Sequence, residues 1–398
     1  MKLLKSNPLI ASKTLTPSSI HELITIVLEA IEKKKTLIPI GGGTQIFTGG
    51  KKLDIAINMS GLTTGFKHNP EDMTATLPAG MLFSDAQIKL KKKDQWIPLD
   101  PPDNGSSTVG GIVSANRWGP RIHRYGTARD WVISTTLING KGKLVKSGAN
   151  VVKNVSGYDL NKAYIGARGS LGILIDVSFK LFPVPENNIT FQACFSDIRE
   201  IFQIVSQIKK ASLDIEALLI ANGRWVSPNE KHFWLLVKIV GSNESIKTQS
   251  SVISSILKNS IAKRWVQLNH EDSNAMWETA NFGNNESKNS FTKAVIITPK
   301  YQTENLASEI IEIDPEISIK IIPCRGVLTV GFNSKKVLYS LNQLIKNYSH
   351  NIEISGKNIV SSDDKWPSIP ATLPLMRKLK TGLDPNNIFA PGTFLGNI

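Results

Sequence analysis

Three consecutive glycines that directly follow a short apolar segment constrain this chain more than any other feature. Residues 36–40 are expected to form a strand, and Gly41-Gly42-Gly43-Thr44-Gln45 follows without a spacer. Because glycine has no Cβ, several backbone N–H groups can converge there, as in loops that hold a pyrophosphate. The segment lacks both the GxGxxG spacing before a helix and the Gly-Lys-Ser/Thr end of a P-loop. Taken alone, it is either a phosphate cradle or a plain tight turn.

Further glycine-dense segments follow along the chain. Residues 98–126 show no long periodic pattern and are expected to form a long functional loop. The notable motifs are Asp-Pro-Pro at 100–102, Thr-Val-Gly-Gly at 108–111, Gly-Pro-Arg at 119–121, Arg-Tyr-Gly at 124–126, Lys-Asn-Val-Ser-Gly-Tyr-Asp-Leu at 153–160 and Gly-Ala-Arg-Gly-Ser-Leu-Gly at 166–172. Since glycine inside regular elements costs stability, one large ligand that runs past all these segments would explain their number.

Hydrophobic periodicity predicts an α+β fold. A first helix is expected at 17–34, with Thr16 as its N-cap and Pro17 at its first position. The other expected elements before residue 185 are strands at 54–58, 73–77 and 173–181, helices at 83–93 and 159–165, and a hairpin at 131–147. After Pro185 strands alternate with amphipathic helices, which indicates a second α+β region without a sequence repeat. A lysine-rich helix is expected at 373–382.

The amino-acid composition and charge argue against several classes of function. The 398 residues suit two to three domains, and the formal charge of +14 comes from scattered lysines without an arginine-rich or aromatic-basic motif. A solvated lysine-rich surface is therefore expected, and nucleic-acid binding is not. Cys194 and Cys324 lack a CxxC partner, which argues against a disulfide scaffold, a zinc site or an iron–sulfur cluster in this chain. With no membrane-spanning stretch or signal peptide in the sequence, a cytoplasmic location is expected.

The ordered set of motifs resembles that of a known family. Gly-Gly-Gly-Thr, Thr-x-Gly-Gly, Arg-Tyr-Gly, Lys-Asn-Val-x-Gly-Tyr-Asp-Leu and Gly-x-x-Gly-x-Leu-Gly together resemble the FAD-linked oxidases of the vanillyl-alcohol-oxidase type. The Asp-Pro-Pro, Gly-Pro-Arg and Lys-Asn-Val-x-Gly-Tyr-Asp-Leu motifs look most like those of the FAD-binding subunits of glycolate oxidases. The resemblance covers residues 1–185 and returns at 383–392, whereas the middle of the chain is matched only by position.

The resemblance implies a domain plan and a set of FAD-binding residues. It implies a two-subdomain PCMH-type FAD-binding domain at 1–185 and a ferredoxin-like α+β cap domain at 186–372. A C-terminal helix and tail at 373–398 would return to the flavin domain. The implied FAD-binding residues are Gly41, Gly42, Gly43, Thr44, Gln45, Pro78, Ala79, Gly80, Thr108, Val109, Gly110, Gly111, Ser114, Asn116, Arg121, Tyr158, Gly169, Gly172 and Ile173.

Departures from the family pattern are informative. Thr44 stands where covalent members often carry a flavin-linking histidine, so non-covalent FAD is expected. The six histidines lack the clustered pair that binds metal in related stand-alone D-2-hydroxyacid dehydrogenases, so no metal is expected. Ala167-Arg168 replaces a small polar and often acidic pair before Gly169, and Ala390 replaces an asparagine that is common in the tail motif.

The resemblance also implies a reaction. A small 2-hydroxy acid, glycolate first among them, would be oxidised to the 2-oxo acid with FAD as the hydride acceptor. Arg121 and Arg124 are the candidate clamps for the substrate carboxylate, since a guanidinium binds a carboxylate bidentately. Both arginines could instead bind FAD phosphate or pair with Asp130. His123 is the candidate base, with a structural role as the alternative.

Two interpretations of the role in an assembly remain open. In the first, the chain is the flavin subunit that oxidises substrate, with a paralogous FAD-linked oxidase subunit and an iron–sulfur subunit as partners. Membrane association would be at most peripheral, through the complex. In the second, the chain is a second flavin subunit with an electron-relay or assembly role and no independent substrate oxidation. Reductases of nucleotide sugars share the FAD domain, but the Lys-Asn-Val-x-Gly-Tyr-Asp-Leu segment disfavours that activity.

Overall fold

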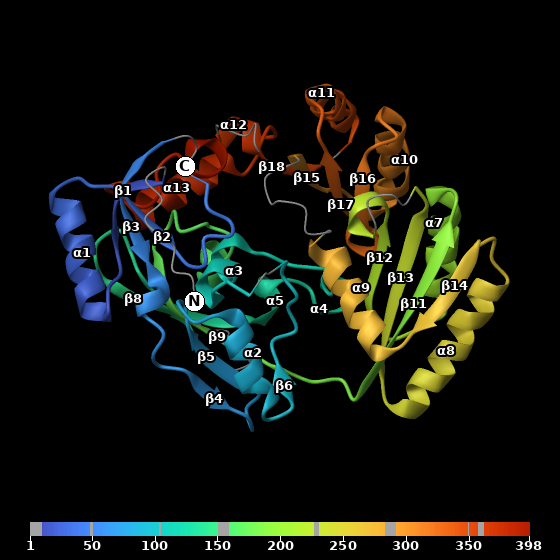
Figure 1. Cartoon of the computed structure of the whole chain (residues 1–398). Coiled ribbons are helices and arrows are strands. Elements are labelled where there is room, and N and C mark those ends of the chain that lie inside the picture. Colours follow the sequence, from blue (N-terminus) through green and yellow to red (C-terminus); the bar gives the residue numbers. More distant parts are fainter. Residues whose placement is uncertain are drawn as a thin grey trace. The chain divides into compact units, whose positions relative to one another are not determined.

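The chain forms two compact units (Figure 1). The computed structural model describes residues 10–47, 51–102, 105–149, 159–226, 231–282, 292–348, 350–356 and 362–398. The first unit comprises Met1–Trp118, Thr127–Val184 and Val360–Ile398, and the second comprises Gly119–Gly126 and Pro185–Ile359. Within the described residues, no helix is long and apolar enough to cross a membrane.

The first unit begins with a three-stranded parallel sheet. Its strands lie in the order β1 (Ala11–Leu15), β3 (Leu53–Asn58) and β2 (Leu37–Ile40). Helix α1 (Ile20–Glu32) buries Leu23, Val27 and Ala30, whose spacing places them on one helical face, in the same core as the apolar side chains of β2 and β3. Packing against α1 and β3 therefore holds β2, the strand that leads into the glycine loop, in place.

The predicted start of α1 is wrong by three residues. Ser19 is the N-cap, and its Oγ accepts a hydrogen bond from the Glu22 N–H at 3.1 Å. The Glu22 carboxylate in turn accepts from the Ser18 N–H at 2.8 Å, which satisfies a further donor at the helix start. Thr16 and Pro17 precede the helix, because the two serines with Glu22 three residues later provide the better cap.

A five-stranded antiparallel sheet forms the second half of the first unit. Its strands are β4 (Lys67–Asn69), β5 (Thr74–Pro78), β9 (Ile173–Lys180), β7 (Val132–Ile138) and β8 (Leu144–Gly148), in this order. The predicted hairpin is present as β7 and β8, which pair from Ser134 to Ile138. The short strands β6 (Gln95–Trp96) and β10 (Phe182–Pro183) pair beside helix α2 (Phe83–Lys91). The short helix α5 (Ala128–Trp131) comes directly before β7 in the sequence, and the short helix α6 (Asn161–Tyr164) comes between β8 and β9.

The expected structureless loop at 98–126 contains two helices. The first, α3 (Val109–Ala115), has Thr108 as its N-cap, with Oγ1 accepting from the Gly111 N–H at 3.1 Å. A Cβ on Gly110 would lie 2.8 Å from the Ala79 Cβ, so the glycine lets α3 approach the end of β5. The second helix, α4 (Ile122–Tyr125), belongs to the second unit. Sequence reasoning missed α3 because its glycines have low helix propensity, which burial overrides.

The C-terminal segment of the first unit packs against β2. After α12 (Ser362–Lys365) and α13 (Leu373–Leu383), residue Phe389 forms a parallel bridge with Leu37. The Leu37 N–H donates to the Ile388 carbonyl and the Ala390 N–H donates to the Leu37 carbonyl, each at 2.7 Å. The glycine loop and the tail are thus joined through the strand that precedes the loop.

A buried lysine holds this tail in place. Lys380 Nζ donates to the Asp384 carboxylate at 2.6 Å, to the Phe389 carbonyl at 2.7 Å and to the Ser170 carbonyl at 2.8 Å. Asp384 also accepts from the N–H groups of Ile388 and Phe389. Burial lowers the pKa of Lys380, although the Asp384 carboxylate opposes this effect. The three acceptors stabilise the buried ammonium and tie the tail to the 166–172 turn.

The second unit is one eight-stranded antiparallel sheet with a repeated topology. Its strand order is β14 (Arg264–Leu268), β11 (Asn187–Phe195), β13 (Phe233–Gly241), β12 (Ile215–Ala221), β16 (Ser318–Ile322), β17 (Val327–Phe332), β15 (Thr292–Ile297) and β18 (Asn351–Ser355). Each half is a β-α-β-β-α-β unit of the ferredoxin-like kind, and the halves join through β12 and β16. The predicted α+β class is confirmed, and the topology repeats although the sequence shows no repeat.

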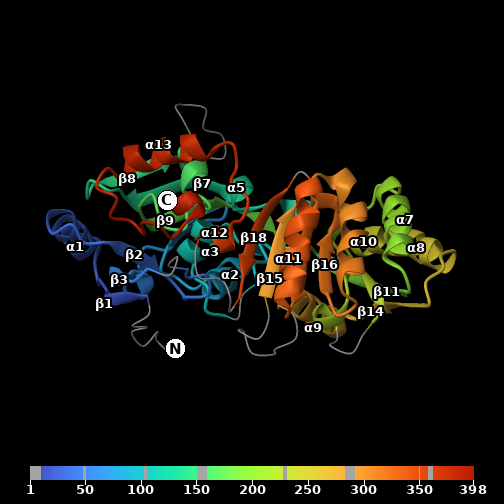
Figure 2. The same ribbon diagram turned by 90° about the horizontal axis from the view of Figure 1, so that it is seen from above.

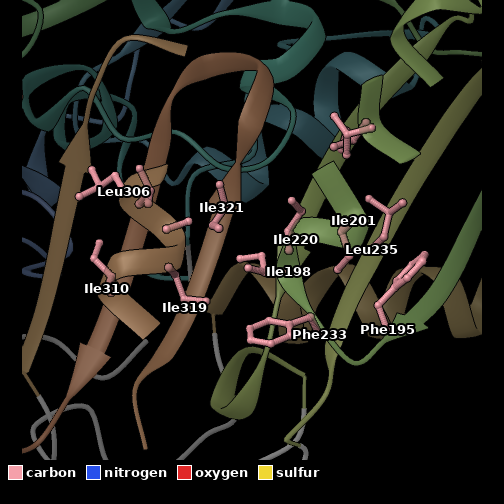
Figure 3. Close-up of a cluster of buried hydrophobic side chains, with 14 of the residues drawn as sticks. Phe195, Ile198, Ile201, Ile220, Phe233, Leu235, Leu306, Ile310, Ile319 and Ile321 are labelled. Carbon is pink, nitrogen blue, oxygen red and sulfur yellow. The ribbon is translucent and has the colours of Figure 1, made fainter. Parts of the chain in front are cut away.

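The two faces of this sheet differ in chemistry. Four helices cover one face with an aliphatic and aromatic core, part of which Figure 3 shows around Phe195, Ile220 and Leu306. These helices are α7 (Ile198–Lys210), α8 (Asn243–Lys258), α10 (Thr303–Ile313) and α11 (Lys335–Leu344), which Figure 2 shows along the sheet. On the other face, buried polar side chains such as those of Thr190 and Lys320 contact α9 (His270–Phe282). The Lys320 Nζ donates to the Asn281 carbonyl at 2.9 Å. That polar face also receives α4.

Candidate functional site

A large hollow in the first unit is lined by the glycine loop and by α3. The empty space between its walls, together with open solvent at its mouth, is about 970 Å³. The lining residues are Ile38, Pro39, Ile40, Gly41, Gly42, Gly43, Thr44, Gln45, Ile46, Phe47, Met59, Ala79, Pro102, Ser107, Thr108, Gly110, Gly111, Ile112, Ser114, Ala115, Arg117, Arg168, Gly169, Leu174 and Thr393. Segments far apart in the sequence thus meet at one cavity.

The glycines of the loop are required by neighbouring chain segments. A Cβ on Gly41 would lie 2.1 Å from the Thr108 Oγ1, and a Cβ on Gly42 would lie 1.6 Å from the Ser106 carbonyl oxygen. Gly43 has φ of +71°, a conformation that other residues rarely adopt. The expectation that a ligand alone accounts for these glycines is therefore incomplete, because close packing of the loop against residues 106–108 already demands them.

The charges that line the cavity have one sign. Arg117 and Arg168 line it, and no aspartate, glutamate or lysine occurs among the described lining residues. Hydroxyl groups of Thr44, Ser107 and Thr393 add neutral hydrogen-bonding capacity. Two guanidinium groups beside a glycine-rich backbone suit a ligand with two phosphate charges, since charge-assisted hydrogen bonds to phosphate are among the strongest in proteins. The residues present therefore fit the pyrophosphate of FAD.

Several residues predicted to bind FAD lie in the cavity wall. They are Gly41, Gly42, Gly43, Thr44, Gln45, Ala79, Thr108, Gly110, Gly111, Ser114 and Gly169. Their convergence follows from two contacts, the loop against residues 106–108 and the approach of Gly110 to Ala79. Their role in binding stays a prediction that the cavity supports.

Other predicted residues lie just outside the wall. Gly80 packs against the Met59 carbonyl, Val109 is fully buried, and Asn116 ends α3 with φ of +46°. Pro78 ends β5 and Ile173 begins β9, where its side chain is buried. Gly172 lines a second hollow of about 210 Å³ beside the first. Tyr158 and the rest of residues 150–158 lie outside the described residues, as do Asp103 and Asn104.

The buried amide of Asn116 is informative for ligand binding. Its Oδ1 has no hydrogen-bond partner among the described residues, although the atom is shielded from solvent. Neighbours on both sides in sequence, Ala115 and Arg117, line the cavity. Because an unsatisfied buried acceptor costs about 1–3 kcal/mol, a donor from a bound molecule or from the undescribed residues would stabilise this site.

Arg121 lies in the second unit, where it shares the carboxylate of Glu216 with Lys238. Its Nε is 3.2 Å from the Glu216 Oε1, and Lys238 Nζ is 3.0 Å from the Glu216 Oε2. Glu216 sits at a register shift between Ile215 and Ala217 in β12, which directs it to the polar face of the sheet. Burial alone would raise the pKa of Glu216, but the Arg121 and Lys238 charges hold it below its usual value.

Arg124 and His123 also contact second-unit residues. Arg124 Nη1 is 2.9 Å from the Asp214 Oδ1, and Arg325 Nη2 donates to the His123 carbonyl at 3.0 Å. Burial, followed by the charge of Arg325 and three further cations, lowers the pKa of His123 to about 4. A base with so low a pKa accepts a proton weakly near neutral pH. In the first unit the Asp130 carboxylate caps α5, where it accepts from the Thr127 N–H at 2.7 Å.

Sequence reasoning missed several cavity residues. Arg117, Arg168, Phe47 and Thr393 line the cavity but were not among the predicted FAD-binding residues. The sequence marked Arg168 as unusual, because Ala167-Arg168 replaces the small polar and often acidic pair that the family pattern has before Gly169. Thr393 directly follows the tail motif that the resemblance brings back to the flavin domain. Among the described residues, no group of three or more His, Cys, Asp or Glu side chains could hold a metal ion.

The residues that line the cavity fit FAD, and comparison with known families agrees. Residues 11–148 match the FAD binding domain family, and residues 368–394 match the C-terminal domain of FAD linked oxidases. The chain thus contains an FAD binding domain and the C-terminal segment of FAD linked oxidases, and both matches indicate FAD as the cofactor.

The chain is similar to curated proteins named as glycolate oxidase subunits and as a D-2-hydroxyglutarate dehydrogenase. It is 29% identical over 261 residues to glycolate oxidase subunit GlcD of Bacillus subtilis, covering 61% of this chain and 54% of that one. It is 30% identical over 210 residues to glycolate oxidase subunit GlcE of Escherichia coli, covering 51% and 59%. It is 31% identical over 173 residues to D-2-hydroxyglutarate dehydrogenase of Stutzerimonas stutzeri, covering 43% and 37%. The chain thus spans about half the length of the curated relatives it matches.

A solved structure shares the fold. Alkyldihydroxyacetonephosphate synthase aligns with a TM-score of 0.71 at 15% identity, covering 95% of this chain and 75% of that one. At this identity the likeness shows the fold alone.

Proposed function

We propose that this chain is the FAD-binding subunit of a hetero-oligomeric oxidase or dehydrogenase that oxidises a small 2-hydroxy acid, with glycolate as the first candidate substrate. The observation that carries the proposal is the cavity of the first unit, where the glycine loop, α3 and two arginines meet without an acidic lining residue among those described. The relatives named glycolate oxidase subunits supply the substrate class.

The residues of the cavity have distinct tasks in this proposal. FAD, when bound, supplies the hydride acceptor for the alcohol carbon of the substrate. Backbone N–H groups of Gly41–Gln45 and the two arginines balance the phosphate charges. Ile38, Met59 and Leu174 give the cavity an apolar wall that excludes water. Because the loop carries neither histidine nor cysteine, the cofactor is held without a covalent bond.

A second candidate function is an electron-relay or assembly subunit without substrate oxidation of its own. The pairing of Arg121 with Glu216 and of Arg124 with Asp214 favours it, since a substrate carboxylate would have to displace a carboxylate of the protein. The low pKa of His123 points the same way. The match to GlcE, a glycolate oxidase subunit, is compatible with such a role.

The proposed partners are a paralogous FAD-linked oxidase subunit and an iron–sulfur subunit. Two relatives that match this chain are named as different subunits, GlcD and GlcE, of glycolate oxidases. The two cysteines of the chain, Cys194 and Cys324, are too few to ligate an iron–sulfur cluster. Electrons would therefore leave through another chain.

An absorbance spectrum before and after anaerobic glycolate tests the proposal. The purified chain, reconstituted with FAD, is expected to show an oxidised flavin band that bleaches when glycolate is added. A flavin band that persists would support the relay or assembly function. Absence of bound flavin after addition of excess FAD would overturn both functions.

A further inference from the structure

We propose that Arg168, held against the Trp366 ring, is a phosphate-binding guanidinium of the dinucleotide site. This inference rests on the proposed FAD site and adds a residue that the family motif does not supply. The sequence has Ala167-Arg168 where the family commonly has a small polar and often acidic pair. An acidic residue there would repel a phosphate, whereas the arginine attracts one.

The backbone of Arg168 is held in an unusual conformation. Its φ is +53°, in the left-handed region that costs about 1–2 kcal/mol for a residue with a side chain. Its N–H donates to the Ser114 carbonyl at 2.8 Å, and Ser114 lines the cavity. Gly169, which follows, has φ of +79° and packs against Pro39, also in the cavity wall. The turn therefore fixes the side chain of Arg168 at the cavity despite the strain.

The side chain of Arg168 is oriented by an aromatic cluster. Its guanidinium carbon lies 5.4 Å from the centroid of the Trp366 ring. The indole makes edge contacts with Phe47, at 5.7 Å between centroids, and with Phe394, at 5.3 Å. Trp366 is only 7% exposed, so its ring has a fixed position. A guanidinium that stacks on a ring through its face keeps its N–H donors in the plane, where they reach an anion bidentately.

The charge of the cavity selects the class of ligand. Arg117 and Arg168 are the charged residues among the described lining, so the wall carries positive charge alone. A dinucleotide brings two phosphate charges, whereas the flavin part without phosphate brings none. Recognition by Arg168 should therefore distinguish FAD from riboflavin and ADP from adenosine.

Binding of ligand pairs with and without phosphate tests the inference. The dissociation constants of FAD and riboflavin would be measured by fluorescence at low and high salt, with ADP and adenosine as competitors of FAD. The variant Arg168→Asn removes the charge, and asparagine accepts a left-handed backbone. Arg199→Asn is the matched control, because Arg199 is exposed and belongs to the second unit.

Arg168→Asn is expected to weaken FAD and ADP about tenfold or more, and riboflavin and adenosine less than about twofold. The salt dependence of FAD binding should shrink in the same variant. Trp366→Leu keeps the charge but loses the stack, so it should give a smaller loss confined to FAD and ADP. Arg199→Asn should leave all four ligands unchanged.

Two outcomes would overturn the inference. Equal weakening of ligands with and without phosphate would make Arg168 a structural residue of the turn, and unchanged FAD and ADP binding would assign the phosphates to other groups. Failure of the unaltered chain to bind FAD at all would instead contradict the proposed function. The two failures are therefore distinguishable in one experiment.

Discussion

Two sets of arginines in the two units of this chain have different surroundings. Arg121 and Arg124 in the second unit each contact a carboxylate of β12 or of the residue before it, at 3.2 and 2.9 Å. Arg117 and Arg168 in the first unit line a cavity whose described lining residues include no carboxylate. Arg121 and Arg124 belong to sequence motifs and were predicted as site residues, whereas Arg117 and Arg168 line the cavity.

The comparison concerns the surroundings of each guanidinium, which are carboxylates in the second unit and a cavity wall in the first. A buried carboxylate needs cations, because an unpaired charge away from water is costly. In the second unit that carboxylate is Glu216, which is 2% exposed and shared by Arg121 and Lys238. In the first unit the guanidinium groups lie at the wall of a cavity, where the phosphates of FAD would bring the negative charge. Substitutions in both units test this comparison.

The largest effect is expected at Glu216. In Glu216→Gln the carboxylate that serves both Arg121 and Lys238 is lost, and two positive charges remain beside a neutral amide. Removing one partner of a buried ion pair costs about 3–5 kcal/mol. Urea unfolding of the second unit, followed by circular dichroism, measures the loss in free energy of unfolding.

The matched control is Asp214→Asn. Its side chain is 60% exposed in the pair with Arg124, so its loss should cost about 0–1 kcal/mol. Equal effects of the two substitutions would show that the buried pair contributes no more than the exposed one. Burial of the Glu216 carboxylate would then not explain why Arg121 and Lys238 lie beside it.

An effect of about 3 kcal/mol or less is expected from His123 as the pH falls. Burial, with the charges of Arg325, Lys209, Arg124 and Lys300, lowers the pKa of His123 from 6.5 to about 4 in the folded chain. The unfolded chain then binds a proton that the folded chain does not, so stability falls between about pH 6.5 and pH 4. Above about pH 6.5 the imidazole is neutral in both states and this contribution vanishes.

Thermal unfolding at several pH values checks this prediction. The melting temperature of the unaltered chain should drop through the stated window, and His123→Gln should flatten the drop, because the glutamine does not titrate. Parallel curves for the two proteins would mean that other groups control the acid sensitivity. A flattened curve would confirm that burial, together with the surrounding cations, disfavours the protonated form of His123.

The smallest of the three effects is expected in the glycine loop. A methyl group in Gly42→Ala would meet the Ser106 carbonyl at 1.6 Å, and overpacking of this kind costs about 1–3 kcal/mol. Chemical unfolding of the FAD-free chain measures this loss without the ligand. A loss of this size in the absence of FAD would confirm that the glycine is required by the fold as well as by any ligand.

Gly382→Ala is the control for this substitution. No atom would lie within 4 Å of a Cβ at this position, and the residue sits in α13, where alanine is favoured over glycine by about 0.5–1 kcal/mol. This variant should therefore gain stability. A loss at Gly382 comparable with that at Gly42 would contradict the steric explanation.

Much of the fold followed from local sequence patterns. The helix expected at 83–93 begins at Phe83 and ends two residues early, at Lys91. The strand expected at 173–181 begins at Ile173 and ends one residue early, at Lys180, because an apolar run between Gly172 and Pro183 is typical of a strand. Helix α3 was missed, since Gly110 and Gly111 hide a helix that tertiary contacts stabilise.

The residues that line the cavity were also predicted only in part, because only some of them belong to contiguous motifs. The glycine loop and the Thr-x-Gly-Gly step are contiguous motifs, so their residues were named before their meeting place was known. Arg168 escaped because its position depends on a left-handed backbone and on contacts with Ser114 and Trp366. The ion pair of Arg121 with Glu216 joins segments far apart in sequence, which no local pattern reveals.

The bridge between residues 37 and 389 has a consequence for biosynthesis. Strand β2 leaves the ribosome early, yet its partner segment follows only after the whole of Pro185–Ile359 has been made. Because these partners are more than 350 positions apart in the sequence, closing the loop between them has a large entropic cost. A nascent first unit therefore lacks both the bridge at Leu37 and the contacts of Lys380 until translation is almost complete.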